Sequence, residues 1–110
     1  MIMRNSLLIL FSFLLIMPSV NAQSDPGMAQ VIDQVLSRAE SQSLLLAKTM
    51  EEIPDALPRT VDKEGKLVTS NSAWWCSGFF PGTLWYLYEN SGNKELKKYA
   101  WMFTNRINKE

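Results

Sequence analysis

The residues of this 110-residue chain whose types and spacing could bind a ligand gather between Trp74 and Glu89. Seven of the sixteen residues in that stretch are aromatic, and they surround a Gly-x-x-Pro-Gly segment that favours a break just before a helix. Aromatic side chains at the start of a helix serve two purposes: they fill a core, or they stack against a flat ligand such as a sugar ring. This stretch is therefore the candidate functional region.

The other residue types offer little for catalysis. The sequence has no histidine, which removes the commonest general base and metal ligand. Cys76 is the only cysteine, so neither an intrachain disulfide nor a cysteine-based zinc site can form. We interpret Cys76 as a small packed residue, because no histidine is present to activate it as a nucleophile. The sequence predicts no metal site and gives no reason to expect a cofactor.

The amino end has the pattern of a secretory signal peptide over residues 1–22. Arg4 supplies the positive charge, an apolar run follows from Leu7 to Met17, and Val20-Asn21-Ala22 has the small residues of a cleavage site. The apolar run of about eleven residues is shorter than the roughly 20 that cross a bilayer. We predict export to the periplasm or the medium, with no stable membrane association after cleavage. An uncleaved anchor is the alternative.

The charge of the predicted mature chain, residues 23–110, excludes one class of partner. Without Arg4, ten basic side chains remain against eleven acidic ones, a net charge of about −1. Lys94, Lys97 and Lys98 form the only local basic cluster, and Glu95 interrupts it. A nucleic-acid-binding protein carries clustered basic surface, so we predict no nucleic-acid partner.

Three helices are predicted to position the aromatic stretch. Asp25-Pro26 is a good helix start, and apolar residues then recur at three- and four-residue steps to about Glu51, so the first helix is expected over 28–51. The second is expected from near Pro81 to Asn90-Ser91-Gly92, and its residues are apolar nearly all round. The third starts near Lys94 and carries one apolar face: Leu96, Tyr99, Ala100, Phe103 and Ile107.

Between the first two helices lies a long connection, from Ile53 to Ala73. Pro54 and Pro58 forbid a continuous helix there, and Lys63-Glu64-Gly65-Lys66 predicts a turn between short extended pieces. Loops of some twenty residues are uncommon in compact domains and often face a ligand. A plain connection is the alternative. The second and third helices should form an antiparallel αα-hairpin.

Two segments carry a resemblance to a known family. The block Trp74-Trp75-Cys76-Ser77-Gly78-Phe79-Phe80-Pro81-Gly82, followed by Leu84-Trp85-Tyr86-Leu87-Tyr88-Glu89, resembles the unsaturated glucuronyl hydrolases, glycoside hydrolase family 88. Members carry Trp-x-x-Gly-Phe-x-Pro-Gly and then an aromatic helix that ends in Tyr-Glu. The preceding Pro58-Arg59-Thr60 and Gly65-Lys66-Leu67 also resemble the family's loop. The resemblance covers most of the mature chain.

The resemblance implies an all-α fold, the N-terminal portion of an (α/α)6 barrel. Residues 23–110 would supply about one and a half of its six helical hairpins, as a truncated N-terminal part of the glycoside hydrolase domain. The second helix would then belong to the inner ring, which would explain its apolar surface. The long loop would help to shape the mouth of the pocket.

The resemblance also implies a reaction. Family members act on oligosaccharides that polysaccharide lyases leave with an unsaturated uronic acid at one end. An aspartic acid protonates the enol ether at C4, water adds at C5, and the resulting hemiketal opens and releases the next sugar. The family's catalytic aspartates would lie beyond Glu110, the first in a His-Asp-x-Gly-Phe segment. None of the four aspartates here matches them: Asp25, Asp33, Asp55 and Asp62.

One binding residue carries over from the family block. Trp75 is the Trp of Trp-x-x-Gly-Phe, and the resemblance implies that its indole stacks against the unsaturated uronyl ring of the oligosaccharide substrate. Trp74, Phe79, Phe80 and Trp85 are expected in the core instead. For Trp75 itself, core packing and ligand contact both remain open.

Three functional readings follow. The first is the N-terminal part of an unsaturated glucuronyl hydrolase, inactive on its own because both catalytic aspartates lie elsewhere. The second is a small exported helical module that binds carbohydrate or another partner without catalysis. The third is a signal-bearing remnant that does not fold.

Overall fold

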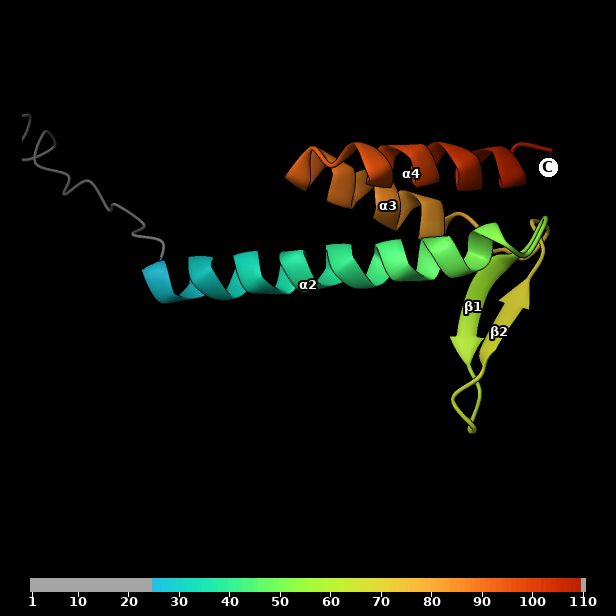
Figure 1. Cartoon of the computed structure of the whole chain (residues 1–110), viewed down its shortest axis with the longest axis horizontal. Helices are drawn as coiled ribbons and strands as arrows, with labels where there is room; N and C mark the ends of the chain where they lie inside the picture. The colour runs from blue at the N-terminus through green and yellow to red at the C-terminus, as the bar shows by residue number, and fades with distance from the viewer. Residues whose placement is uncertain (1–24, 110) are drawn as a thin grey trace, which may run out of the picture.

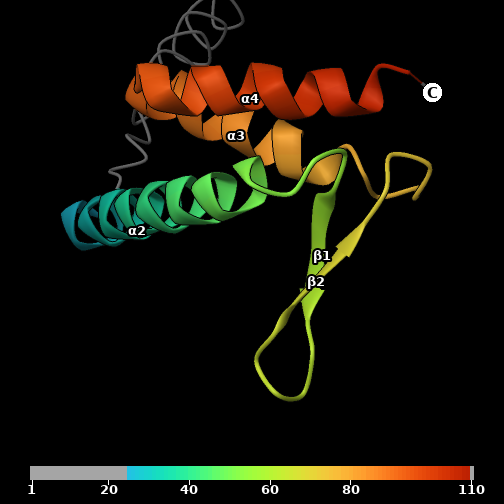
Figure 2. The same cartoon turned by 45° about the vertical axis from the view of Figure 1, so that its right-hand side comes forward.

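The structure is a computed structural model that describes residues 25–109. The predicted signal peptide, residues 1–22, lies outside the described residues. The elements follow in the order α2 (Pro26–Glu51), β1 (Leu57–Val61), β2 (Leu67–Ser70), α3 (Phe79–Ser91) and α4 (Lys94–Ile107). The three helices lie side by side, and the two strands project from the carboxyl end of α2 (Figures 1 and 2). Within the described range, no helix has the length and apolar character needed to cross a bilayer.

The long helix α2 starts as predicted but is buried over only part of its length. An Asp25 carboxylate oxygen accepts a hydrogen bond from the Gly27 N–H at 2.9 Å, and Pro26 takes the first helical position. The amino-terminal half of α2 extends past the ends of α3 and α4 (Figure 1). Its apolar side chains are therefore at least half exposed: Met28, Val31, Ile32 and Val35. Full burial is confined to Ala47 and Met50, near the other end.

Helices α3 and α4 form the predicted αα-hairpin. Gly92 ends α3 with a positive φ of 69°, a left-handed conformation that a residue without Cβ adopts easily, and its N–H donates to the Tyr88 carbonyl at 2.7 Å. Asn93 then caps α4 by accepting from the Glu95 N–H at 2.9 Å. The reversal therefore comes from a C-cap and an N-cap that follow each other directly.

The core lies where the hairpin packs on the carboxyl half of α2. The predicted apolar face of α4 is confirmed, with Leu96, Tyr99, Ala100 and Phe103 buried and Ile107 packed against them. Phe103 is fully buried, and the Phe80 ring meets it edge-on at 4.9 Å between ring centroids. Trp85 is half-buried and donates its indole N–H to the Thr104 hydroxyl at 3.0 Å.

Helix α3 departs from its prediction at two points. It begins at Phe79, two residues before Pro81, so the proline is the third residue of the helix. In this first turn its missing N–H has no intrahelical partner to lose. Its apolar surface is also only partly covered: Leu84 and Leu87 are buried, whereas Tyr86 is 64% exposed. In the described residues, α3 packs on α4 and α2, and Tyr86 lies outside these contacts.

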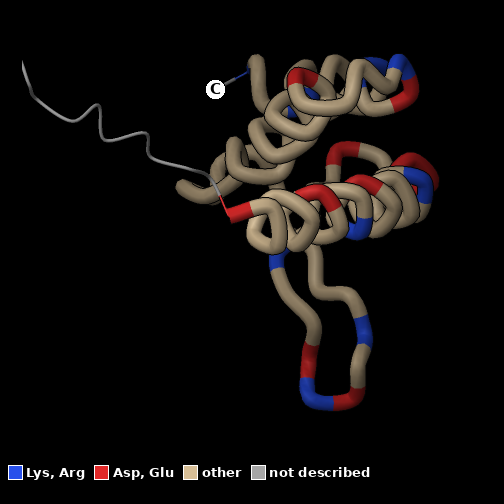
Figure 3. The backbone as a smooth tube through the Cα atoms, turned by 90° about the vertical axis from the view of Figure 1, so that its left-hand side faces the viewer, with Lys and Arg blue, Asp and Glu red and all other residues tan. Residues whose placement is uncertain are grey.

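The connection between α2 and α3 confirms the predicted turn between short extended pieces, and the two pieces pair as a β-hairpin. Strands β1 and β2 pair antiparallel, and the predicted turn joins them. An Asp62 carboxylate oxygen accepts from the N–H groups of Glu64 (3.1 Å) and Lys66 (2.7 Å), and Gly65 supplies a positive φ of 81°. Acidic and basic residues alternate around the tip (Figure 3). A two-stranded sheet is therefore added to the expected all-α class.

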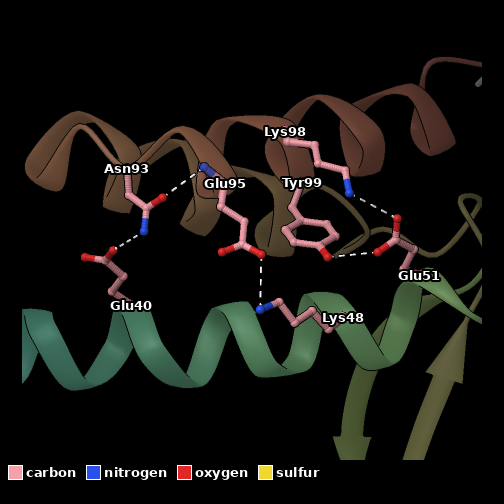
Figure 4. Close-up of polar contacts among 7 residues, drawn as sticks. All are labelled: Glu40, Lys48, Glu51, Asn93, Glu95, Lys98 and Tyr99. Atoms are coloured by element: carbon pink, nitrogen blue, oxygen red, sulfur yellow. Dashed lines mark hydrogen bonds and ion pairs between the residues drawn. The ribbon is translucent and has the colours of Figure 1, made fainter.

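A row of polar contacts joins α2 to α4 (Figure 4). The contacts run in the same residue order along both helices. Asn93 Nδ2 donates to Glu40 at 2.6 Å, Lys48 Nζ pairs with Glu95 at 3.1 Å, and Lys98 Nζ (3.3 Å) and Tyr99 OH (2.8 Å) contact Glu51. Helices α2 and α4 are therefore parallel, with α3 antiparallel to both.

Arg106 fixes the chain where it leaves α2. Its Nη1 donates to the carbonyls of Met50 (3.0 Å), Ile53 (3.0 Å) and Ala56 (2.7 Å), and the guanidinium carbon lies 4.6 Å from the centre of the Phe103 ring. These carbonyls belong to the helix end and the turn that leads to β1, where the last carbonyls of a helix lack regular intrahelical donors. One side chain of α4 thus sets the direction in which the β-hairpin leaves the helices.

Candidate functional site

The segment between β2 and α3 sends two adjacent tryptophans into different surroundings. Successive turns fold it: the Trp74 N–H donates to the Asn71 carbonyl at 3.3 Å, and the Ser77 N–H donates to the Trp74 carbonyl at 2.8 Å. Trp74 is half-buried, whereas Trp75 is 87% exposed. Within the described residues, Trp75 is therefore a surface side chain rather than part of the core.

Trp75 borders a shallow hollow at the start of α3. Gly78 and Phe79 line the rest of it, and its volume is about 270 Å³. The prediction that Phe79 lies in the core is wrong for the described residues, because 70% of this side chain is exposed. Phe79 is the first residue of α3, ahead of the turns that pack on α4, so neither of the other helices covers it.

A second groove lies on the other side of Phe79, between the β-hairpin and α3. Its volume is about 360 Å³. The residues around it come from α2, both strands and the aromatic segment: Leu46, Pro58, Arg59, Thr60, Val61, Leu67, Trp74, Cys76, Phe79, Phe80 and Thr83. Most of these are apolar, and Arg59 is the one charged residue among them. Phe79 lines both hollows, so the two are neighbours on one surface.

Arg59 and Trp74 make the most specific contact in this groove. The guanidinium carbon of Arg59 lies 5.3 Å from the centre of the Trp74 ring, within the range of a cation–π interaction. Arg59 is exposed, and in residues 25–109 no carboxylate pairs with it. Its N–H groups therefore stay available to an acidic ligand.

Among residues 25–109, this arrangement offers side chains for binding but no carboxylic acid for proton transfer. No aspartate or glutamate of residues 25–109 lines either hollow, and that range holds no cluster of three metal-ligating side chains. Cys76 lines the groove as a free, half-buried thiol. That none of the aspartates present is catalytic stays a prediction.

The four aspartates lie away from the aromatic surface and have other partners. Asp25 caps α2, and Asp62 organises the hairpin turn. Asp55 accepts from Lys109 Nζ at 2.8 Å, which holds the pKa of the carboxyl below its usual value. Asp33 lies on the exposed face of α2. These positions make Asp25 a helix cap, Asp33 a solvated helix residue, and Asp55 and Asp62 polar residues of the connection.

Two linked pKa shifts belong to the seam between α2 and α4. Hydrogen bonds from Tyr99 and then Lys98 lower the pKa of the Glu51 carboxyl. Burial, and then the hydrogen bond to Glu51, raises the pKa of Tyr99 to about 12. This pair joins two helices and faces neither hollow, so its shifted pKa values concern stability rather than chemistry on a ligand.

Sequence reasoning found Trp75 but did not single out Arg59 as a ligand-facing residue. Pro58-Arg59-Thr60 was noted only for its resemblance to a family loop. Its position in a long connection just before the aromatic stretch was the available signal, because such loops often face ligands. The stacking of Arg59 on Trp74 depends on how the β-hairpin folds back, which the linear sequence does not reveal.

Comparison with known proteins adds one informative match. No protein-family model and no curated protein matches this chain. A solved structure described as the crystal structure of an unsaturated glucuronyl hydrolase specific for heparin is similar to it, with a TM-score of 0.54 and 34% sequence identity. The match covers 68% of this chain and 21% of that enzyme, so it spans about a fifth of the enzyme's length.

The match to this solved structure identifies the fold class of the chain. Three packed helices that match part of an (α/α)6-barrel enzyme confirm the expected fold class, with the β-hairpin as an addition. Within that class, the chain resembles the unsaturated glucuronyl hydrolases, as its Trp-x-x-Gly-Phe-x-Pro-Gly block predicted.

Proposed function

We propose that this chain is the N-terminal part of an unsaturated glucuronyl hydrolase and supplies one wall of its sugar-binding pocket. The exposed indole of Trp75 carries the proposal, because a large aromatic face left in solvent at the start of a helix suits stacking on a sugar ring. The structural neighbour, an enzyme specific for heparin, supports the same class of substrate. The substrate would be an oligosaccharide that ends in an unsaturated uronic acid.

The chemistry of this substrate sets what the pocket must do. Hydration of the C4=C5 bond needs a carboxylic acid that delivers a proton to C4 and a water that adds at C5. In this proposal those groups come from outside residues 25–109, and Trp75 holds the flat ring in place for them. Holding reactants in the reacting geometry lowers the barrier by removing the entropy cost of their encounter.

The test is the turnover of an unsaturated uronyl disaccharide by the protein expressed from the complete reading frame that encodes this chain. Loss of the ultraviolet absorbance of the C4=C5 bond measures the reaction. We expect turnover, and we expect Trp75→Ala to lower kcat/KM by about ten- to hundredfold, since each 1.36 kcal/mol of lost binding is about tenfold.

Three results would count against parts of the proposal. No turnover by the complete product would refute the hydrolase assignment, and binding without turnover would favour the exported carbohydrate-binding module. Turnover by the purified 110-residue chain alone would show that its own residues are catalytic. Trp101→Ala is the control, because Trp101 is another exposed tryptophan, 52% accessible, but lies on α4 and lines neither hollow.

A further inference from the structure

We propose that the groove between the β-hairpin and α3 is a second part of the substrate site, where Arg59 binds an acidic group of the sugar. This inference rests on the proposed function and names the residue that selects for charge. The acidic group is a sulfate or a carboxylate, since both present the same fork of oxygens to a guanidinium.

The geometry of Arg59 fits that task. The guanidinium carbon of Arg59 lies 5.3 Å from the centre of the Trp74 ring, and in residues 25–109 no ion pair occupies its N–H groups, which can therefore donate to an acidic ligand. An arginine held on an aromatic ring loses less freedom on binding than one that moves in solvent. In the described part of the chain, every acidic residue that forms an ion pair does so with a lysine, so none neutralises Arg59.

The rest of the groove fits a sugar rather than a free anion. The walls are largely apolar, with Phe79, Phe80 and Trp74 on the helix side and Val61 and Leu67 on the hairpin side. Sugars carry apolar C–H faces that such walls accept, and a charged substituent that extends toward solvent would meet Arg59. A bare anion would gain nothing from this apolar lining.

The position of the groove connects it to Trp75. Phe79 borders both the groove and the hollow beside Trp75, so a disaccharide with one ring on Trp75 would pass Phe79 on the way to Arg59. The hollow beside Trp75 and the groove with Arg59 could therefore bind two parts of one ligand, a flat ring and an acidic substituent.

The experiment compares two unsaturated disaccharides derived from heparin, one sulfated and one without sulfate, with the protein expressed from the complete reading frame. We expect Arg59→Ala to lower kcat/KM for the sulfated disaccharide by about ten- to hundredfold, the effect of losing hydrogen bonds to a charged group. Arg59→Lys keeps the charge without the planar fork and should lose less. Arg38→Ala is the control, because Arg38 is an exposed arginine on α2 outside the groove.

The pattern across the two disaccharides identifies the acidic group. A loss confined to the sulfated disaccharide supports recognition of sulfate, and an equal loss on both supports recognition of the uronic carboxylate. Unchanged kinetics in Arg59→Ala, together with a loss in Trp75→Ala, would overturn this inference and leave the proposed function standing. Failure of the unaltered protein to turn over either disaccharide would overturn the proposed function itself.

Discussion

Two groups of aromatic residues lie close together in this chain and have opposite surroundings. The inner group, Phe80, Tyr99 and Phe103, packs between α3 and α4, where Phe103 is fully buried. The outer group, Trp75 and Phe79, is 87% and 70% exposed. Residue type does not separate them, since Phe79 and Phe80 are neighbours in the sequence. What separates them is whether α4 lies opposite.

This difference in burial indicates different roles for the inner and outer aromatic groups. Buried aromatic side chains contribute to stability through the large apolar area they remove from water. Exposed ones contribute little to stability and leave that area available to a ligand. The comparison therefore predicts that substitutions in the inner group change unfolding, whereas substitutions in the outer group change binding.

The largest expected effect is that of Phe103→Ala. Removal of this fully buried ring should cost about 3–5 kcal/mol of the free energy of unfolding, because a cavity remains among Phe80, Tyr99 and Arg106. Urea unfolding followed by circular dichroism measures it, and Phe103→Leu is the milder variant should the alanine variant fail to fold. Trp75→Ala is the control and should lie within about 0.5 kcal/mol of the unaltered chain. Equal losses at both positions would break the distinction between the groups.

A smaller loss is expected when Arg106 no longer holds the exit from α2. Arg106→Met keeps apolar contact with Phe103 but removes the side-chain donor to the carbonyls of Met50, Ile53 and Ala56. We expect a loss of about 1–3 kcal/mol in the same urea experiment. Arg38→Met, on the exposed face of α2, should leave the midpoint unchanged. If Arg106→Met unfolds at the same urea concentration as the unaltered chain, this side chain does not organise the turn.

The smallest effect concerns the pH dependence of the seam between α2 and α4. The pKa of Tyr99 is raised from its ordinary 10 to about 12, so its contribution to stability is fully present below pH 10 and is lost as the pH rises toward 12. The pKa of Glu51 is lowered, so its contribution is present above its ordinary value of 4.5 and is lost in more acidic solution. Tyr99→Phe should weaken both dependences.

The measurement for this pair is the difference in urea midpoint between the unaltered chain and Tyr99→Phe, taken near neutral pH and again near pH 12. The difference should shrink at the higher pH, because the unaltered chain alone loses the hydroxyl's contribution. A difference that stays constant across this range would mean that the hydroxyl of Tyr99 does not couple the two helices through its protonation.

How far the sequence predicted the structure depends on the range of the interactions. Local signals succeeded: Asp25 caps α2, Gly92 ends α3, and the apolar spacing on α4 marks its buried face. The core position expected for Phe79 was wrong, and the pairing of the two predicted extended pieces into a β-hairpin was not foreseen. Both depend on which element lies opposite, and a local pattern carries no information about that.

The amino-acid sequence by itself determined three helices, their caps and the aromatic block that resembles the unsaturated glucuronyl hydrolases. These follow from interactions within a few residues, such as capping hydrogen bonds and side-chain spacing. Only the tertiary structure decided that Trp75 faces solvent while Phe80 packs on Phe103, and that Arg59 lies on Trp74 beside an apolar groove. Those contacts join α3 to α4 and the β-hairpin to the aromatic segment, and they exist only once separate elements have packed together.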